Sequence, residues 1–183
     1  MQALTTEQYT ALVRIIKSGH GKMRASPRIA AALMAEANLG MRIGDILRLR
    51  LDDIVLYGKR YRLNIVEEKT GKRRTFTVPE QLYRFFCNYC TEQKIPADQP
   101  MFPTTVRSVQ RHIKSACEIL GYSNVSTHSF RKWYATDIYE ASGHDIVLVQ
   151  QLLQHSSPNI TRRYIGISDE KIEKAIAGHV LLA

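Results

Sequence analysis

The stretch "DIVLYGKRYRLNIVEEKTGKRRTFTVP", residues 53–79, decides how this chain folds. It holds three runs rich in β-branched and aromatic residues, divided by Gly58-Lys59 and by the polar segment Lys69–Lys72. Short runs of this kind with glycine-containing turns between them are typical of antiparallel hairpins. We therefore predict three short antiparallel strands, which end at Pro79.

The sequence on both sides of this stretch carries helix-start and helix-stop signals instead. Thr5 and Gln8 have the spacing of a capping box, and Ser26-Pro27 opens an alanine- and leucine-rich helix that Gly40 ends. That helix is apolar nearly all round, so we expect it to be central and buried. The helices predicted from these signals cover about residues 5–17, 27–39, 42–49, 80–93, 105–121, 127–143, 145–155, 157–166 and 169–177. The predicted fold is one domain over residues 1–183, mainly α with a small three-stranded antiparallel sheet (α+β).

The charge of the chain points to a polyanionic partner. Lys and Arg together number 26 against 17 Asp and Glu, which gives a formal net charge of +9. Charge alone does not separate nucleic acid from an acidic membrane surface. No apolar run reaches the roughly 18 residues of a spanning helix, and the N-terminal sequence lacks the pattern of a signal peptide. We therefore expect a cytoplasmic protein that does not enter a membrane.

The cysteines and histidines do not form a metal-binding pattern. "CNYC", residues 87–90, is a single CxxC, and a zinc site would need a second pair where only Cys117 remains. We interpret Cys87 and Cys90 as two thiols one turn apart on an amphipathic helix. The six histidines include no HExxH motif. We expect neither a metal nor any other cofactor.

Six polar residues lie next to segments with an apolar pattern. Each of them, taken alone, has an ordinary explanation. A turn arginine or a hairpin-tip lysine is commonly solvated, a histidine after a helix commonly interacts with its dipole, and a tyrosine commonly packs on the core. Only the set suggests a site. Its members are Arg42, Lys69, His128, Arg131, His155 and Tyr164.

Three segments that hold these residues resemble the boxes of the tyrosine recombinase (phage integrase) family. They are "NLGMRIGDILRL" (38–49), "HSFR" (128–131) and "LLQHSSPNITRRYIGI" (152–167). The resemblance covers nearly the whole chain, with the boxes in the family's order. It matches Arg42 to the family's first active arginine, followed by an acidic residue at Asp45. It also matches His128 and Arg131 to the His-x-x-Arg box, His155 and Tyr164 to the last box, and Lys69 to the lysine of the strand hairpin.

The resemblance implies a site-specific DNA recombinase or integrase that breaks and rejoins strands. Tyr164 would attack the scissile phosphorus and form a covalent 3′-phosphotyrosine intermediate with a free 5′-hydroxyl. Arg42 and Arg131 would hold the nonbridging oxygens, and His155 would be a third donor. We expect the two arginines also to favour the phenolate of Tyr164.

The same resemblance assigns the proton transfers and the supporting residues. Lys69 would be the general acid for the departing oxygen, and His128 the proton acceptor or hydrogen-bond partner of the nucleophile. Asp45 would orient a neighbouring side chain. Residues expected to contact DNA phosphates are Lys72, Arg73, Arg74, Arg107, Arg111, Lys114, Arg162 and Arg163.

The implied partners are double-stranded DNA and further copies of the chain. Members of the family act as four subunits on two duplexes. The tail "ISDEKIEKAIAGHVLLA" (167–183) has an amphipathic helix that would pack on its own domain or, as the resemblance favours, dock on a neighbouring subunit. Two departures stand out. Gln154 occupies a position where the family usually has glycine, and the N-terminal DNA-binding domains typical of the family are absent from this chain.

Two other functions stay open at the level of sequence. One is a DNA-binding module without catalytic activity. The other is a nicking-closing topoisomerase, which would relax supercoils on any sequence.

Overall fold

The computed structural model describes residues 3–69, 71, 73–155 and 157–165. The mainly helical fold with one antiparallel sheet that the sequence predicts is confirmed. The predicted helix at 169–177 lies outside the described residues. The elements are α1 (Thr6–Ser18), α2 (Pro27–Leu39), α3 (Ile43–Ile46), a 3₁₀ turn (Leu51–Asp53), β1 (Ile54–Tyr57), β2 (Arg60–Val66), β3 (Arg73–Val78), α4 (Glu80–Gln93), α5 (Val106–Leu120), α6 (Thr127–Ala141), α7 (Ile146–Leu153) and α8 (Pro158–Ile165).

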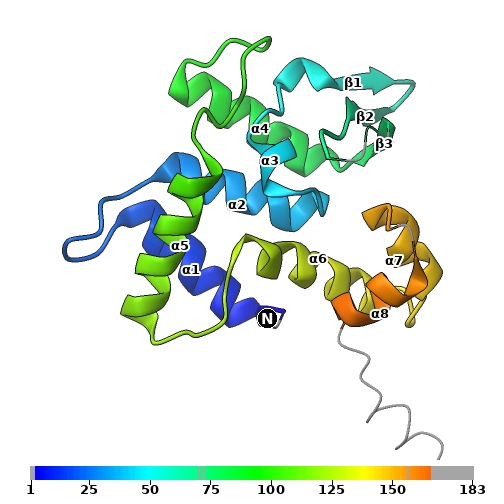
Figure 1. Cartoon of the computed structure of the whole chain (residues 1–183). Coiled ribbons are helices and arrows are strands. Elements are labelled where there is room, and N and C mark those ends of the chain that lie inside the picture. The colour runs from blue at the N-terminus through cyan, green and yellow to red at the C-terminus, as the bar shows by residue number, and fades with distance from the viewer. Residues whose placement is uncertain (1–2, 70, 72, 156, 166–183) are drawn as a thin grey trace, which may run out of the picture.

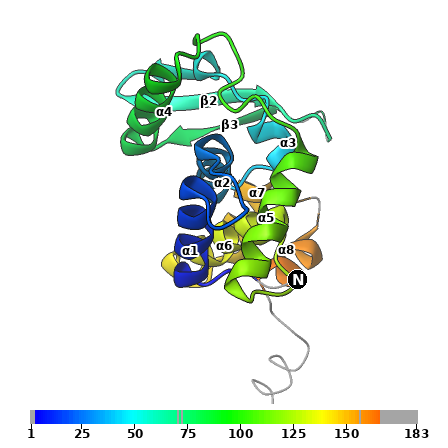
Figure 2. The same cartoon turned by 90° about the vertical axis from the view of Figure 1, so that its left-hand side faces the viewer.

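The three strands form one meander with the order β1-β2-β3. In its register Leu63 of β2 lies between Ile54 of β1 and Phe76 of β3, so three apolar side chains line one face. Helix α4 lies against the sheet (Figure 2), and Tyr83 of α4 stacks on Tyr61 of β2 with 3.8 Å between ring centroids. The alternation along β2 therefore buries one face under α4.

Helix α2 is the centre of the helical part, as its composition predicts. Nine of its thirteen residues are buried, most of them alanine or leucine. Small side chains let neighbouring helices approach closely, and α2 lies between the sheet with α4 and the group of α1, α5 and α6 (Figure 1). Tyr9 of α1 stacks on Trp133 of α6 with centroids 4.8 Å apart, which joins two of these helices.

The helix ends follow the predicted caps with one exception. Thr5 and Gln8 form the capping box, and the Ser26 hydroxyl accepts from the amide of Ile29 with Pro27 at the first helical position. The predicted helix 42–49 is shorter, because α3 ends at Ile46. Beyond it the carbonyl of Leu49 accepts from the amide of Met101, a contact that a continued helix would prevent.

A second, smaller apolar cluster lies at the C-terminal end of α6. Ala135 of α6, Val149 and Leu153 of α7, and Ile165 of α8 form it, and it is separate from the large core around α2. Figure 1 shows α7 and α8 together beside the end of α6. The two last described helices thus rest on α6 and on each other.

Two of the three cysteines lie in the apolar core. Cys90 of α4 and Cys117 of α5 are buried, Cys87 is half-buried, and all three are free thiols. Among the residues that the structure describes, no group of three or more potential metal ligands gathers. Within the same residues, no helix has the length and apolar character needed to cross a membrane.

Candidate active site

The turn between α2 and α3 places Arg42. Gly40 ends α2 in the left-handed conformation (φ 57°), which glycine adopts without a steric penalty. The ring of Tyr134 on α6 lies so close that a Cβ on Gly40 would approach it to 2.3 Å. The turn therefore requires glycine both for its backbone angle and for its contact with α6.

Arg42 is tied to the base of the β2–β3 hairpin. Its Nη1 lies 2.5 Å from Oε2 of Glu67, whose side chain is wholly buried. One residue further along, the amide of Glu68 donates to Oδ1 of Asp45 at 3.0 Å. Asp45 also accepts from Arg48 at 2.7 Å, so this buried carboxylate orients two neighbours. The hairpin that carries Lys69 is thus anchored on α3, while Lys69 itself is exposed.

Helix α6 provides His128 in its first turn and Arg131 one turn later. Arg131 is only 2% exposed and is among the largest fully buried side chains of the protein. Its Nη2 donates to the carbonyl oxygen of Leu153 at 2.8 Å, at the end of α7. A buried guanidinium held in this way has little freedom to turn, as a fixed phosphate-binding donor requires.

The chain changes direction after α7 to bring in His155. Gln154 caps α7 in the left-handed conformation (φ 53°, ψ 36°), which costs a non-glycine residue roughly 1–2 kcal/mol. Its amide Nε2 donates to the carbonyl of Arg73 on β3 at 3.2 Å. Next to it, Nδ1 of His155 lies 3.0 Å from the hydroxyl of the buried Thr161. The glutamine therefore keeps the turn that glycine would make, and Thr161 orients the imidazole.

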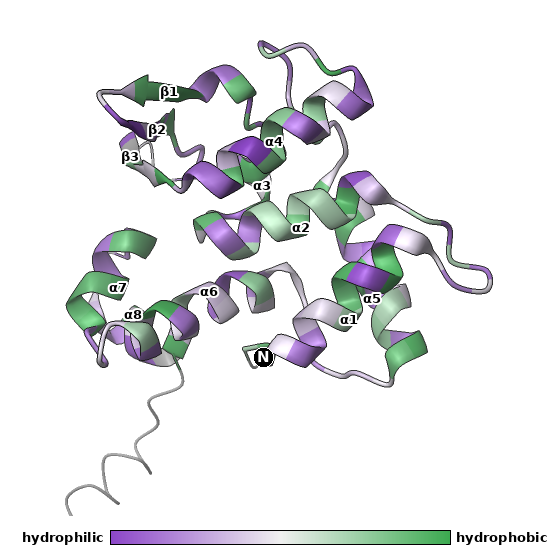
Figure 3. Ribbon diagram, turned by 180° about the vertical axis from the view of Figure 1, so that it is seen from behind, coloured by the Kyte–Doolittle hydropathy of each residue, from purple (hydrophilic) through white to green (hydrophobic). Residues whose placement is uncertain are grey.

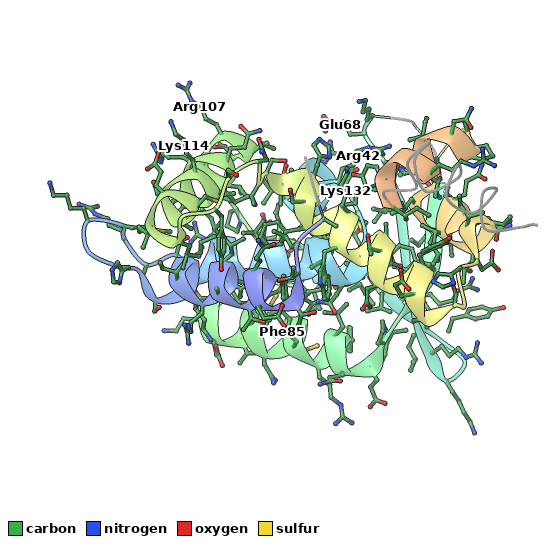
Figure 4. The ribbon with its side chains drawn as sticks, turned by 90° about the horizontal axis from the view of Figure 1, so that it is seen from below. Arg42, Glu68, Phe85, Arg107, Lys114 and Lys132 are labelled. Carbon is green, nitrogen blue, oxygen red and sulfur yellow. The ribbon has the colours of Figure 1, made fainter. Side chains whose placement is uncertain are left out.

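Tyr164 on α8 is half-buried among these groups. Its hydroxyl lies 3.5 Å from Nδ1 of His128, and its ring packs edge to face with His155 at 5.0 Å between centroids. The Nζ of Lys132 lies 5.5 Å from the centre of the Tyr164 ring. Figure 4 shows Lys132 and Arg42 on the same side of the molecule. Residues that are distant in sequence therefore surround the phenol.

The pKa of Tyr164 is raised above the ordinary phenol value, although both arginines act in the expected direction and favour the phenolate. Burial is the main cause and the charge of Glu36 adds to it, while Arg131 and Arg42 act in the opposite direction. In the protein without DNA, burial outweighs the two guanidinium groups. Arg131 nevertheless acts through both its charge and a hydrogen bond to the phenol.

The pKa of His128 is lowered from its usual value. Burial is the largest cause, followed by the positive charges of Arg131, Lys69, Arg42 and Lys132. His128 is therefore neutral at pH 7 and has a ring nitrogen able to accept a proton. The charge of Lys69, on the exposed hairpin, contributes to this lowering.

The basic residues expected to contact DNA lie outside this cluster. Figure 4 shows that Arg107 and Lys114 of α5 project on the same side of the molecule as Arg42 and Lys132. The remaining described members of that set, all exposed, are Arg73 on β3, Arg111 on α5 and Arg162 on α8. Lys72 and the side chains of Arg74 and Arg163 lie outside the described part of the structure.

Sequence reasoning missed three charged residues of the site. Glu36 is buried in α2 and acts on both Arg131 and Tyr164, Glu67 holds Arg42, and Lys132 lies over the Tyr164 ring. One signal was present for Glu36, because it is the one acidic residue of an otherwise alanine- and leucine-rich helix.

The chain is similar in sequence to known proteins. A sequence profile described as the phage integrase family matches residues 2–171. The probable integrase/recombinase YoeC of Bacillus subtilis is 30% identical over 146 residues, which cover 75% of this chain and 77% of YoeC. The chain spans only 60% of tyrosine recombinase XerA of Pyrococcus furiosus, at 25% identity and 96% coverage of this chain.

Solved structures show the same fold at lower identity. The lambda integrase tetramer bound to a Holliday junction superposes with a TM-score of 0.68 at 17% identity, covering 89% of this chain and 47% of that one.

Proposed function

Because the chain belongs to the phage integrase family, we propose that it cleaves and rejoins DNA strands as a site-specific tyrosine recombinase, through a covalent 3′-phosphotyrosine intermediate. One observation carries the proposal. The half-buried hydroxyl of Tyr164 lies 3.5 Å from Nδ1 of His128, and the charges of the buried Arg131 and of Arg42 act on it. A tyrosine that served only to pack on the core would not require a histidine and two arginines from other segments of the chain.

The first chemical step in this proposal is an exchange of phosphate esters. The phenol oxygen of Tyr164 forms a bond to the phosphorus while the bond from phosphorus to the 5′-oxygen breaks. Arg42 and Arg131 hold the nonbridging oxygens, where negative charge accumulates in the transition state, and His155 donates a further hydrogen bond. Losing one such preorganised donor costs about 10²–10³ in rate in comparable sites.

The proton transfers follow from the positions of the bases and acids. Neutral His128 accepts the phenol proton, because its lowered pKa leaves a ring nitrogen free of a proton at pH 7. The departing 5′-oxygen takes a proton from Lys69 on the exposed hairpin. Burial raises the pKa of the Tyr164 phenol in the free protein, so the nucleophile stays protonated until a phosphate is bound.

We propose that DNA lies along the side of the molecule that carries Arg42, Arg107 and Lys114 (Figure 4). The exposed basic residues of α5 recur at the spacing of one helix face, so three phosphates can be contacted together. The compartment that we propose is the cytoplasm, where such an enzyme meets DNA. Residues 1–183 would form a single catalytic domain.

We further propose a tetramer of the chain on two DNA duplexes, supported by the lambda integrase tetramer on a Holliday junction. The segment after Ile165 would dock on the neighbouring subunit. Deleting residues 169–183 should then leave cleavage of a single site but abolish strand exchange between two sites, measured on the same DNA. Unimpaired exchange by the shortened chain would contradict the docking.

The covalent step is tested with nicked duplexes, in which the short cleaved strand diffuses away and traps the intermediate. The substrate is a pool with randomised sequence around the nick, because such a pool samples many candidate target sites at once. We expect a denaturant-resistant protein–DNA adduct, which Tyr164→Phe abolishes while DNA binding persists. Tyr139→Phe is the matched control, since Tyr139 packs on the same small cluster.

Two results would overturn parts of this proposal. An adduct formed by the Tyr164→Phe variant would assign the nucleophile to another residue. Relaxation of supercoiled plasmids regardless of their sequence, with no preferred member of the duplex pool, would indicate a nicking-closing enzyme instead of a site-specific recombinase.

A further inference from the structure

Lys132 is a half-buried cation that the proposed reaction does not use. It lies on α6 four residues after His128, so the two side chains share one face of that helix. Its Nζ lies 5.5 Å from the centre of the Tyr164 ring on α8. A lysine ammonium within about 6 Å of a ring centre is attracted by the electron-rich face of the ring. Lys132 therefore contacts the ring of Tyr164, whereas His128 lies at its hydroxyl.

Two groups of different kinds contact the Tyr164 ring. The imidazole of His155 packs edge to face with it, with 5.0 Å between centroids and 69° between the ring planes, and the ammonium of Lys132 lies over the ring. In this arrangement the hydroxyl is 3.5 Å from Nδ1 of His128. Since Lys132 and His128 belong to the same helix, the two contacts together fix the phenol relative to α6.

The length of α8 explains why such a contact matters. The helix has eight residues, and Tyr164 is the last but one of them. Its apolar packing on α6 and α7 runs through the buried Ile165, a member of the small apolar cluster. Packing of a neighbouring residue places the helix, but it does not choose the direction of the phenol ring. The cation over the ring supplies that choice.

A phosphate contact is the other role open to a lysine at this place, because Figure 4 shows Lys132 on the same side of the molecule as Arg42. Two observations favour the ring. Lys132 is half-buried, whereas Arg107 and Lys114 on the same side are exposed. Its ammonium also already has an aromatic partner in the protein without DNA.

We propose that Lys132 is a positioning residue for the nucleophile, whose ammonium holds the Tyr164 ring so that the phenol hydroxyl stays at His128. The role is exerted through Tyr164 and needs no contact between Lys132 and DNA. The inference rests on the proposed function, because it needs Tyr164 to attack the phosphorus. It adds to that function a residue from outside the set that the reaction employs.

Three variants separate the charge of Lys132 from its packing. Lys132→Met removes the ammonium but keeps a long unbranched side chain. Lys132→Arg keeps a cation, and a guanidinium also stacks on aromatic faces. Lys59→Met is the matched control, because it removes the same charge from an exposed residue in the turn between β1 and β2. For each variant we would measure DNA affinity over a range of salt concentrations, and the single-turnover rate of adduct formation at saturating protein on the duplex selected from the randomised pool.

We expect Lys132→Met to lower the saturating rate by about 3- to 30-fold, which corresponds to the loss of one cation–π contact. Its DNA affinity and the salt dependence of that affinity should match those of the wild type. Lys132→Arg should recover most of the lost rate, and Lys59→Met should react like the wild type.

Three outcomes would overturn the proposal. An unchanged saturating rate in Lys132→Met would show that the contact has no part in the reaction. A weaker affinity with a salt slope reduced by about 0.9, at an unchanged saturating rate, would identify Lys132 as a phosphate contact. A Lys132→Arg variant as slow as Lys132→Met would mean that the site needs the lysine ammonium itself and not a cation over the ring.

A second measurement needs no DNA and no activity. Tyrosine rings are labelled with carbon-13, the Tyr164 signals are identified by their loss in Tyr164→Phe, and nuclear Overhauser contacts of the ring are recorded. We expect contacts from this ring to the Lys132 methylene groups and to the His128 ring, with the His128 contact kept in Lys132→Arg and weakened in Lys132→Met.

A wild-type spectrum without the contact between Lys132 and Tyr164 would overturn the inference, and it decides the matter even where Lys132→Met does not fold. If no duplex forms an adduct with the wild type, the proposed function fails. The ring contacts would still show in that case whether Lys132 sets the position of Tyr164.

Discussion

Arg42 and Glu67 form a pair in which Nη1 of the arginine lies 2.5 Å from Oε2 of a wholly buried carboxylate. Glu67 directly follows β2, at the start of the hairpin tip that carries Lys69. One contact therefore sets the position of Arg42, the proposed phosphate-binding residue, relative to the segment that carries the proposed general acid.

Replacing Glu67 by Gln should slow adduct formation by about 10- to 100-fold. The amide keeps the shape but loses the charge that holds the guanidinium, and small misplacements of a catalytic donor are costly. The measurement is the single-turnover rate on the nicked duplex, together with DNA affinity. Glu68→Gln is the matched control, because Glu68 is exposed and pairs with Arg48 at the surface, where ion pairs contribute little. Equal rates for the two variants would contradict a positioning role for Glu67.

Gly40→Ala should destabilise the fold more than Gly121→Ala. Both glycines end a helix in the left-handed conformation, so both variants incur the backbone penalty of about 1–2 kcal/mol. Only at Gly40 would the new Cβ meet a ring, that of Tyr134, while space is open around Gly121. Urea unfolding curves of the two variants measure the difference. If both lose the same stability, the contact between the α2 end and α6 is not as tight as described.

Gln154→Gly should leave adduct formation intact and keep the protein at least as stable as Gln154→Ala. Glycine removes the left-handed strain of roughly 1–2 kcal/mol, which offsets the loss of the hydrogen bond from Gln154 to the Arg73 carbonyl. Alanine loses that hydrogen bond and keeps the strain. Melting temperatures and cleavage rates of both variants provide the check. A glycine variant less stable than the alanine variant would mean that the backbone conformation is not what limits this turn.

Neutralising the exposed cations of α5 should weaken DNA binding and flatten its salt dependence. Each phosphate contact removed lowers the slope of log K against log salt by about 0.9. The variant changes Arg107, Arg111 and Lys114 to Gln, and binding to one duplex is followed over a range of salt concentrations. Arg84→Gln is the control, because α4 runs along the opposite side of the molecule in Figure 4. An unchanged slope would exclude α5 from the DNA interface.

The features that the sequence predicts well are those set by neighbouring residues. The Thr5–Gln8 capping box, the Ser26-Pro27 helix start and the three-stranded meander all form as predicted. Each depends on residues a few positions apart. The early end of α3 is different, because the carbonyl of Leu49 bonds the amide of Met101 and no residue near Leu49 indicates that partner.

The residues of the site also divide into those that the sequence predicts and those that depend on distant elements. The family resemblance finds Arg42, His128, Arg131, His155 and Tyr164, and the structure brings their segments together. The family resemblance does not identify Glu36 or Glu67. A buried acid is recognisable as part of the site only when the folded structure shows the arginine from another element that it interacts with. The same holds for the raised pKa of Tyr164, since the degree of burial of a phenol is a property of the packed helices.

The exposure of the side chains on strand β1 also depends on the packing of distant elements. Figure 3 shows this strand as strongly apolar, although Leu56 and Tyr57 are exposed. Its composition predicts a strand correctly, but the share of each side chain that is buried depends on which elements pack against the sheet.

The hydrogen bond from Arg131 to the carbonyl of Leu153 joins α6 to the last residue of α7. Ala135, one turn after Arg131 on α6, belongs to the smaller cluster, and Leu153 closes the helix that leads to His155. A guanidinium has several donors, so one side chain can grip an anion and a backbone carbonyl at the same moment. In the proposed reaction, Arg131 would therefore hold the phosphate and the end of α7 together, so the phosphate and the α8 helix that carries Tyr164 would be positioned from the same side chain.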